Sequence, residues 1–326
     1  MRIPCIALAM GCSSPSPSAP VDALDASVTT PDASPPAPVR IAFVQHPTGE
    51  SKHIYITEVD ASGKGSNPTR LTGDADDETF VTWSPDGKRL VYERANAGAA
   101  IYIINSDGSG EQRLSPSPGL DVSPSWSPDG SQIVYARLQA MPQPDQPPPM
   151  TDLRIMNADG TGDHLVLANL VLGIEPRWSS QDLIVFMSYA DAPGLNIYTV
   201  DLNGAGLHEL TNVAGANNAE PVWSHDGAHI SFGSDREGND KLNIFKMDAD
   251  GGNVEQLTRF DVPFEAGDTS WSSDDKKLAF EWDVDGMKQS DPNAVAEVWT
   301  VNADGTGAVT TSISCSDVDC SPRFQP

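Results

Sequence analysis

Short apolar segments recur along this chain, and turns rich in Asp and Gly separate them. In one unit, an apolar segment at residues 89–92 is followed, after a loop, by a second at residues 101–104. The segments are brief and rich in Val, Ile, Tyr and Phe, which is typical of β-strands. Gly and Pro interrupt every long window, so the pattern predicts no amphipathic helix of useful length.

A five-residue phrase marks each unit. Trp-Ser-Pro-Asp-Gly stands at residues 83–87 and again, intact, at 126–130, and weaker copies follow at intervals of 43 to 53 residues. An Asp-Gly pair at this spacing predicts a tight turn, because Asp caps its own backbone and Gly accepts positive φ. We expect a structural role for the anchors and turn acids of the repeat, namely Trp83, Asp86, Trp126, Asp129, Trp178, Trp223, Asp226, Trp271 and Phe324.

Each unit holds four predicted strands when the segment that ends at Trp is included. Several strands, such as 101–104, are apolar on both faces and must therefore be covered on both sides. Four-stranded antiparallel sheets that pack face to face around an axis meet this demand. The sequence therefore predicts an all-β protein, a β-propeller.

The two chain ends are complementary. Residues 40–44, 53–57 and 69–72 match strands two, three and four of a unit, whereas the last unit supplies only strand one, at Phe324. Joined, they complete one blade, which gives six blades and a ring without an open edge at the seam. A linear solenoid is the alternative, but it would need capping ends.

The phrase Pro-x-Trp-Ser-x-Asp-Gly, then Ile-Tyr near Asp-Gly, then Leu-Thr, resembles the TolB-like propeller repeat of bacterial envelope proteins. The resemblance covers residues 40–326, and it implies a protein-binding role in the envelope. TolB carries an additional α/β domain before its propeller, for which this sequence has no room. Because the resemblance is at the level of the repeat, and propellers host many roles, it does not imply Tol-Pal function.

The N-terminal segment resembles a bacterial lipoprotein signal. Residues 1–12 hold one Arg and a short apolar run that ends at Cys12, the residue that would carry lipid. Ordinary secretion and an uninformative N-terminus are the alternatives. Residues 13–39 are rich in Ser, Pro, Ala and Asp and predict a disordered tether. The propeller is expected at 40–326, as a monomer in the envelope, lipid-anchored and facing the periplasm or the outer-membrane surface.

Two cysteines, Cys315 and Cys320, lie in the predicted propeller close to its seam. In an exported protein such a pair predicts a disulfide. A metal site would need further ligands at suitable spacing, and two free thiols are the remaining possibility.

The chain is strongly acidic, with a formal net charge of −26. Such a chain repels nucleic acid and anionic lipid, so contact with the membrane is expected through the lipid anchor alone. The loops of one face of the ring, which link strands two to three and blade to blade, vary in length and carry acids. We predict a ligand-binding mouth there for a basic peptide or a hard cation, formed by Asp74, Asp76, Asp77, Glu78, Asp121, Glu175, Glu220, Asp268, Asp317 and Asp319. The alternatives to a binding site are that the loop sequences diverged without acquiring a function, and that the acids cluster only because the whole chain is acidic.

Catalytic and cofactor motifs are weak. The group Asp74, Asp76, Asp77 and Glu78 is the best candidate for calcium, but no cofactor is predicted. The six His residues are scattered, and neither a nucleophile elbow nor a phosphate-binding loop is present. The sequence thus predicts a non-enzymatic scaffold that binds an envelope protein or peptide. A carbohydrate-active propeller, either a lyase for acidic glycans or a glycan-binding protein, is the alternative, and His and Arg clustered in the channel would favour it.

Overall fold

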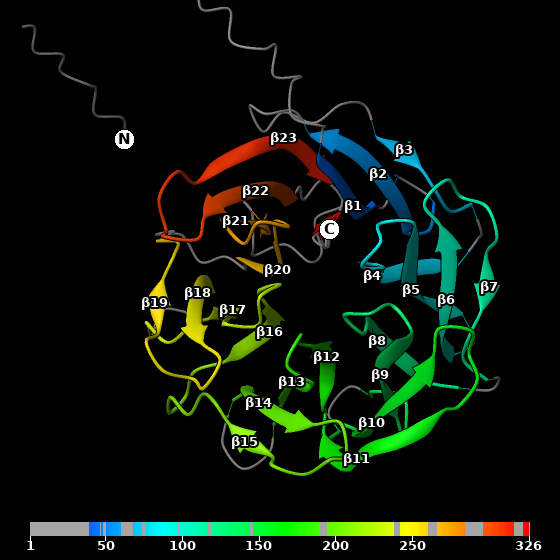
Figure 1. Cartoon of the computed structure of the whole chain (residues 1–326), viewed down its shortest axis with the longest axis horizontal. Coiled ribbons are helices and arrows are strands. Elements are labelled where there is room, and N and C mark those ends of the chain that lie inside the picture. The colour runs from blue at the N-terminus through cyan, green and yellow to red at the C-terminus, as the bar shows by residue number, and fades with distance from the viewer. Residues whose placement is uncertain are drawn as a thin grey trace, which may run out of the picture. The chain divides into compact units, whose positions relative to one another are not determined.

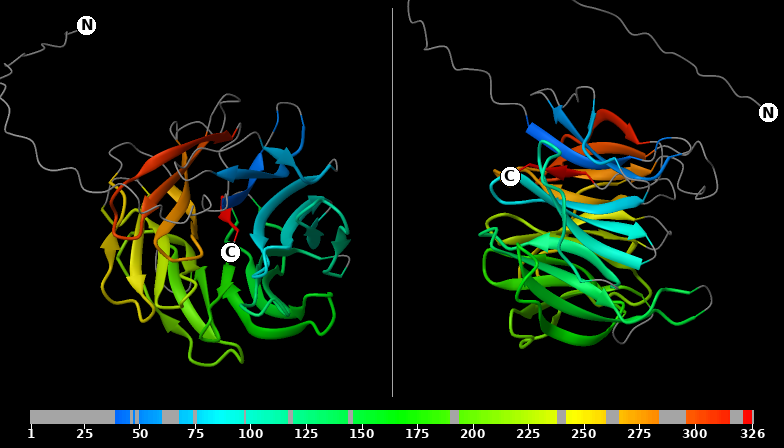
Figure 2. Two further views of the ribbon diagram at one scale, coloured as in Figure 1. Left: turned by 45° about the horizontal axis from the view of Figure 1, so that its top comes forward. Right: turned by 90° about the vertical axis from the view of Figure 1, so that its right-hand side faces the viewer.

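Twenty-four strands of the described residues form six four-stranded antiparallel sheets arranged as a ring (Figure 1). The computed structural model describes residues 39–45, 47, 50–59, 68–73, 76–96, 98–116, 119–143, 146–189, 194–237, 242–259, 266–283, 296–315 and 322–325. The six-bladed propeller expected from the repeat is confirmed. Figure 2 shows the same ring from two further directions, with each blade as a twisted sheet.

In each blade the strands follow one another from the innermost to the outermost. The first three blades are β24 (Arg323–Phe324), β1 (Val39–Gln45), β2 (His53–Val59) and β3 (Thr69–Arg70); β4 (Asp77–Trp83), β5 (Arg89–Asn96), β6 (Gly98–Asn105) and β7 (Gln112–Arg113); and β8 (Asp121–Trp126), β9 (Gln132–Leu138), β10 (Met150–Asn157) and β11 (His164–Val171).

The remaining three follow in the same order. They are β12 (Ile174–Trp178), β13 (Leu183–Ser188), β14 (Asn196–Asp201) and β15 (His208–Glu209); β16 (Asn218–Trp223), β17 (His229–Ser234), β18 (Asn243–Asp248) and β19 (Glu255–Gln256); and β20 (Ala266–Trp271), β21 (Lys277–Asp283), β22 (Ala296–Asn302) and β23 (Val309–Cys315).

The ring closes as the complementary ends predict. Strand β24 pairs antiparallel with β1, with Ile41 opposite Phe324 and Ala42 opposite Arg323. Phe324 packs with Ile41 and Phe43 of its own blade and with Ala279 of the neighbouring blade. A two-residue strand therefore holds the first and last parts of the propeller together.

Apolar side chains pack between adjacent blades. One cluster joins Val44 and Ile54 of the first blade to Trp83 and Leu90 of the second, and another joins Val91 to Trp126 and Tyr135. The middle strands contribute most of the fully buried side chains, because both of their faces are covered by neighbouring blades. Apolar burial of this kind supplies the main stabilisation of the ring.

The repeated turn follows each Trp on one face of the ring. In the first copy, Ser84 Oγ donates to Asp86 Oδ1 (2.7 Å), and the amide of Arg89 donates to Ser84 Oγ (2.9 Å). The bond from Ser84 lowers the pKa of the Asp86 carboxyl. Gly87 has φ of 65°, a conformation that Gly adopts without strain. We call this side the turn face, and the opposite side, which carries the inter-blade loops, the loop face.

Candidate functional site

The inner strands share a distortion three residues before each Trp. Here the register of pairing shifts, for example between Ile174 and Arg177 of β12. The bulge residue has positive φ in all five described copies, which are Phe80, Ser123, Glu175, Glu220 and Asp268, with φ of 49–56°. Such bulges turn a side chain away from its regular direction and are frequent near functional sites.

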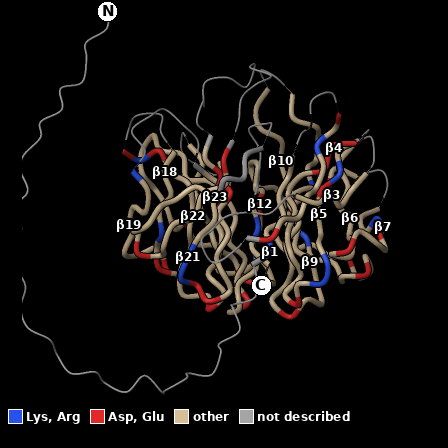
Figure 3. The backbone as a smooth tube through the Cα atoms, turned by 90° about the horizontal axis from the view of Figure 1, so that it is seen from above, with Lys and Arg blue, Asp and Glu red and all other residues tan. Residues whose placement is uncertain are grey.

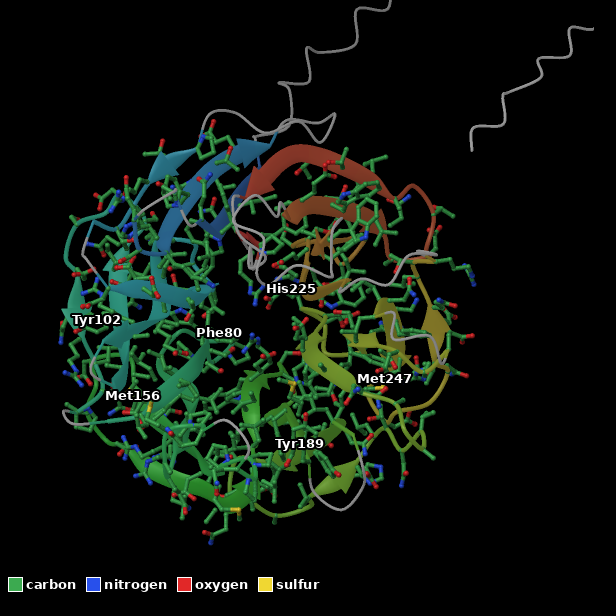
Figure 4. All side chains as sticks on the ribbon, turned by 180° about the vertical axis from the view of Figure 1, so that it is seen from behind. Phe80, Tyr102, Met156, Tyr189, His225 and Met247 are labelled. Atoms are coloured by element: carbon green, nitrogen blue, oxygen red, sulfur yellow. The ribbon has the colours of Figure 1, made fainter. Side chains whose placement is uncertain are left out.

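Three carboxylates occupy this bulge position in consecutive blades. Glu175, Glu220 and Asp268, which we call the channel acids, lie on β12, β16 and β20, the strands nearest the axis of the ring (Figure 1). Figure 4 shows Phe80, the equivalent residue of β4, beside the central opening. The structure therefore brings together three of the acids that the sequence places at a mouth.

The channel acids interact with one another. Glu220 Oε2 accepts a hydrogen bond from the amide of Asp268. Burial, and then the negative charges of Asp268 and Glu175, raises the pKa of the Glu220 carboxyl well above its usual range. A cation placed at this level of the channel would relieve that repulsion.

Two arginines occupy the position two residues after the bulge position of their strands, just before the aromatic anchor. Arg177 directly precedes Trp178, and Arg323 directly precedes Phe324. Arg323 Nη2 lies 2.8 Å from Asp268 Oδ1, and its Nη1 donates to the carbonyl of Asp268 (3.1 Å). Burial, and then the positive charge of Arg323, lowers the pKa of Arg177 to about 10.

A cavity of about 160 Å³ opens at the turn-face end of these strands. The residues that line it include Arg177, Arg323, four tryptophans and His225 of a turn. His225 is exposed, and its Nδ1 lies 2.9 Å from Asp275 Oδ1. Figure 4 places His225 beside the central opening. The channel is thus acidic at one level and carries cationic and aromatic groups at the next.

Glu78 lies within a buried polar network. Its side chain is fully buried, with Oε2 3.0 Å from His53 Nδ1 and 2.6 Å from Thr72 Oγ1, while Oε1 lies 3.1 Å from Arg94 Nη2. Burial raises the pKa of the Glu78 carboxyl, although its hydrogen bonds and Arg94 oppose the shift. The carboxylate is therefore satisfied by protein groups and is not exposed to a ligand.

Asp121 is likewise fully buried. Arg137 binds it with two parallel bonds, Nε to Oδ1 at 2.6 Å and Nη2 to Oδ2 at 3.0 Å. This fork geometry is the strongest arrangement between Arg and a carboxylate. The structure thus assigns Glu78 and Asp121 to stabilising ion pairs away from solvent, which separates them from the channel acids.

The remaining predicted residues are dispersed or lie outside the described part. Asp76 is half-buried, and the exposed Asp77 accepts a bond from the amide of Lys52 (2.9 Å). Cys315 ends β23. Outside the described residues are the signal, the tether up to residue 38, most of the longer inter-blade loops, Cys12, Asp74, Asp317, Asp319 and Cys320, whereas Val39 belongs to β1.

The described residues contain no group of three or more His, Cys, Asp or Glu side chains that could hold a metal ion. They also include no helix long and apolar enough to cross a membrane. Acidic positions lie on both faces of the ring, interspersed with Lys and Arg (Figure 3). Charge on the surface therefore does not distinguish the faces, and the channel is the more specific feature.

The two channel arginines are not among the residues that the loop pattern predicts. A signal was available, because both stand one residue before an aromatic anchor, where the other four units carry Thr82, Ser125, Val222 and Ser270. In a strand, alternate residues share a face, so the residue before each anchor lies on the face opposite to the anchor itself. Comparing this position across the repeats would have identified Arg177 and Arg323.

Comparisons with known proteins agree with this geometry. A family model described as the TolB beta propeller domain matches residues 18–143 and 159–326. TolB from Acinetobacter baumannii is 20% identical over 88% of this chain and 67% of its own, with a TM-score of 0.70. A putative TolB from Agrobacterium tumefaciens is 17% identical, with 88% and 99% covered and a TM-score of 0.63.

Another solved structure with this fold is an oligogalacturonate lyase in complex with manganese. It is 15% identical over 83% of this chain and 73% of its own, with a TM-score of 0.58. A search of curated proteins finds no match. At these identities the solved structures establish the fold and leave the activity open.

Proposed function

Because the chain belongs to the TolB β-propeller domain family, we propose that it is a non-enzymatic scaffold of the bacterial cell envelope. It binds a protein or peptide at the loop face and the adjoining mouth of the channel. The observation that carries this proposal is the alignment of Glu175, Glu220 and Asp268 at one position of consecutive inner strands.

The channel acids favour a basic ligand. Carboxylates gathered at one level of the channel would focus negative potential there. Burial raises the pKa of Glu220 most, and the negative charges of Asp268 and Glu175 raise it further; a Lys or Arg side chain inserted from the loop face would reduce that repulsion. A basic peptide segment is therefore the proposed ligand, and a hard cation is the competing one.

The cellular setting is part of the same proposal. Residues 1–12 would direct lipidation of Cys12, and residues 13–39 would tether a monomeric propeller to the envelope membrane. Labelling cells with a lipid precursor tests this directly: the wild type should incorporate label, and a Cys12→Ser variant should not. Equal labelling of both proteins would refute the anchor.

Binding of a basic peptide tests the site. We expect a Lys- and Arg-containing peptide library to yield ligands whose affinity falls at least tenfold when Glu175→Gln, Glu220→Gln and Asp268→Asn are combined. Tenfold corresponds to about 1.4 kcal/mol, which is modest for three charge interactions in a partly dry site. Calcium titrated alone into the same proteins distinguishes a cation site from a peptide site.

A matched control removes the same charge elsewhere. The variant Asp182→Asn, Asp250→Asn and Glu255→Gln changes three exposed acids that lie away from both the channel and the loop face. It should bind the peptide as the wild type does, apart from a small screened effect of net charge. If both triple variants lose affinity equally, the channel acids are not the site.

One observation favours a second candidate, a carbohydrate-active propeller. Arg177 and Arg323 line a channel cavity whose walls are otherwise largely aromatic, and such a cavity suits an acidic sugar. The test is incubation of the pure protein with oligogalacturonate, with unsaturated products read by absorbance. Turnover that Arg177→Met abolishes would replace the scaffold proposal with this one.

A further inference from the structure

The cavity at the turn face is built from equivalent residues of successive blades. Each inner strand ends there with its aromatic anchor, and the cavity walls include the indoles of Trp83, Trp178, Trp223 and Trp271. We call this space, about 160 Å³ in volume, the indole cavity. It lies at the end of the channel opposite to the loop face, so its ligand is independent of the partner proposed above.

Arg177 is the unusual group in this wall. Arg177 is only 6% exposed. Among the described residues, its guanidinium makes one hydrogen bond, from Nη1 to the carbonyl of Pro176, its own chain neighbour, at 3.2 Å. Within the same part of the chain, no carboxylate lies within ion-pair distance of it. A guanidinium offers five donors, so Arg177 keeps donor capacity at the wall of the cavity.

Arg323 places a second positive charge in the same wall, and Asp268 holds its guanidinium in position through the two bonds described above. The channel acids lie one layer toward the loop face and partly offset the two cations. Among the described residues, the Arg177 guanidinium has no hydrogen bond beyond the one to the Pro176 carbonyl.

We infer that the indole cavity binds a carboxylate group, with Arg177 as the main anchor, Arg323 as a second cation and the indole rings packed against the apolar part of the ligand. A carboxylate matches the planar fork of a guanidinium and can accept two parallel hydrogen bonds from it. The volume suits a terminal residue or a single sugar ring. The carboxylate therefore belongs either to the free C-terminus of a peptide or to a uronic acid.

Paired probes test the charge requirement. An N-acetyl dipeptide with a free carboxylate is compared with its amide, and galacturonate is compared with galactose. Binding is read from tryptophan fluorescence, because four indoles form the wall, and from calorimetry. At least one acid should bind about tenfold or more tightly than its neutral counterpart, as expected for a charge-assisted bond, and the pair that shows this identifies the source.

Variants locate the site. Arg177→Met keeps the length of the side chain and removes its charge, and it should abolish the preference for the acid. Ser125→Ala, at the equivalent position of another blade and in the same wall, should leave the preference unchanged. Equal binding of acid and neutral probes by the wild type, or an unchanged preference in Arg177→Met, would overturn the inference.

A measurement on the unsubstituted protein avoids any folding defect of the variant. The side-chain Nε signal of Arg177, followed by NMR, should shift on addition of the preferred acid and not on addition of its neutral counterpart. A signal that does not move while the acid binds would place the ligand elsewhere. Loss of peptide binding at the loop face would leave this result untouched, so the two proposals fail separately.

Discussion

The indole Nε1 of Trp83 lies 3.1 Å from the carbonyl oxygen of Arg323, 240 residues away. The same bond recurs between Trp126 and Thr82, Trp223 and Arg177, and Trp271 and Val222, at 3.2–3.3 Å. In each case the acceptor is the residue just before the anchor of the preceding blade. The repeated Trp therefore joins neighbouring inner strands by a buried hydrogen bond as well as by packing.

Ring closure depends on Phe324. This side chain is 9% exposed and packs against both its own blade and the last full blade. We expect Phe324→Ala to lower the free energy of unfolding by about 3–5 kcal/mol, the usual cost of emptying a buried aromatic site. Urea unfolding measures this, and Val309→Ala, which changes a 48% exposed side chain, should stay within about 0.5 kcal/mol. Similar values for the two variants would contradict this closure.

The indole bond can be measured by comparing two blades. Trp223→Phe removes the bond to the Arg177 carbonyl and should cost about 1–2 kcal/mol more than Trp178→Phe. The reason is that Trp178 Nε1 is buried without an acceptor among the described residues, so its loss removes an unsatisfied donor. Thermal and urea unfolding of both variants provide the comparison. A larger loss for Trp178→Phe would show that the bond contributes little.

The raised pKa of Glu220 predicts a dependence of stability on pH. Because the folded state holds the proton more tightly than the unfolded chain, the stabilisation is complete below the ordinary value of about 4.5 and is lost as pH rises through the raised pKa. Glu220→Gln keeps an acceptor for the Asp268 amide and removes the titration. We expect its melting temperature to exceed that of the wild type by about 2 °C or more at pH 8 and to match it at pH 4.

The exposed Glu255→Gln is the control for that series and should show no such trend. A Glu220→Gln variant that is equally affected at pH 4 and pH 8 would mean that folding does not shift the pKa of the Glu220 carboxyl.

Asp121 should affect stability and not ligand capture. Asp121→Asn weakens a bidentate bond with Arg137 in a fully buried position, so we expect a loss of about 1.5–3 kcal/mol in urea unfolding. Peptide affinity, measured on the folded fraction, should remain within about twofold of the wild type. A tenfold loss of affinity without loss of stability would return Asp121 to the ligand site.

The repeat predicts the propeller architecture because each hairpin is specified by residues that are close together in the sequence. Each Asp-Gly turn and each apolar segment specifies its own hairpin, and the missing strand beside Arg40 matches the extra strand at Phe324. These features depend on neighbouring residues, so a single sequence contains them. The closure of the sixth blade follows from counting strands.

The channel site is harder to predict from the sequence, because it depends on the direction in which each side chain points as well as on its position in the strand. Glu78 and Glu175 both precede a Trp in an inner strand, by five and three residues respectively. The bulge at the third position is absent from the strand pattern, so the sequence could not show that Glu78 meets Arg94 while Glu175 takes the bulge position. The acidic loops predict a site at the loop face and give no indication of Arg177, because most residues that line the cavity belong to strands.

Photo-crosslinking in cells tests most directly whether a partner binds at the loop face. A photo-crosslinking residue at Met141, 53% exposed beside the loop between β9 and β10, should capture a specific envelope protein in living cells, and capture should fall when the channel acids are neutralised. The same residue at Leu207, 51% exposed next to a turn of the opposite face, should not capture it. Equal capture from both positions, or none at Met141 while the pure protein cleaves acidic glycans, would contradict the account.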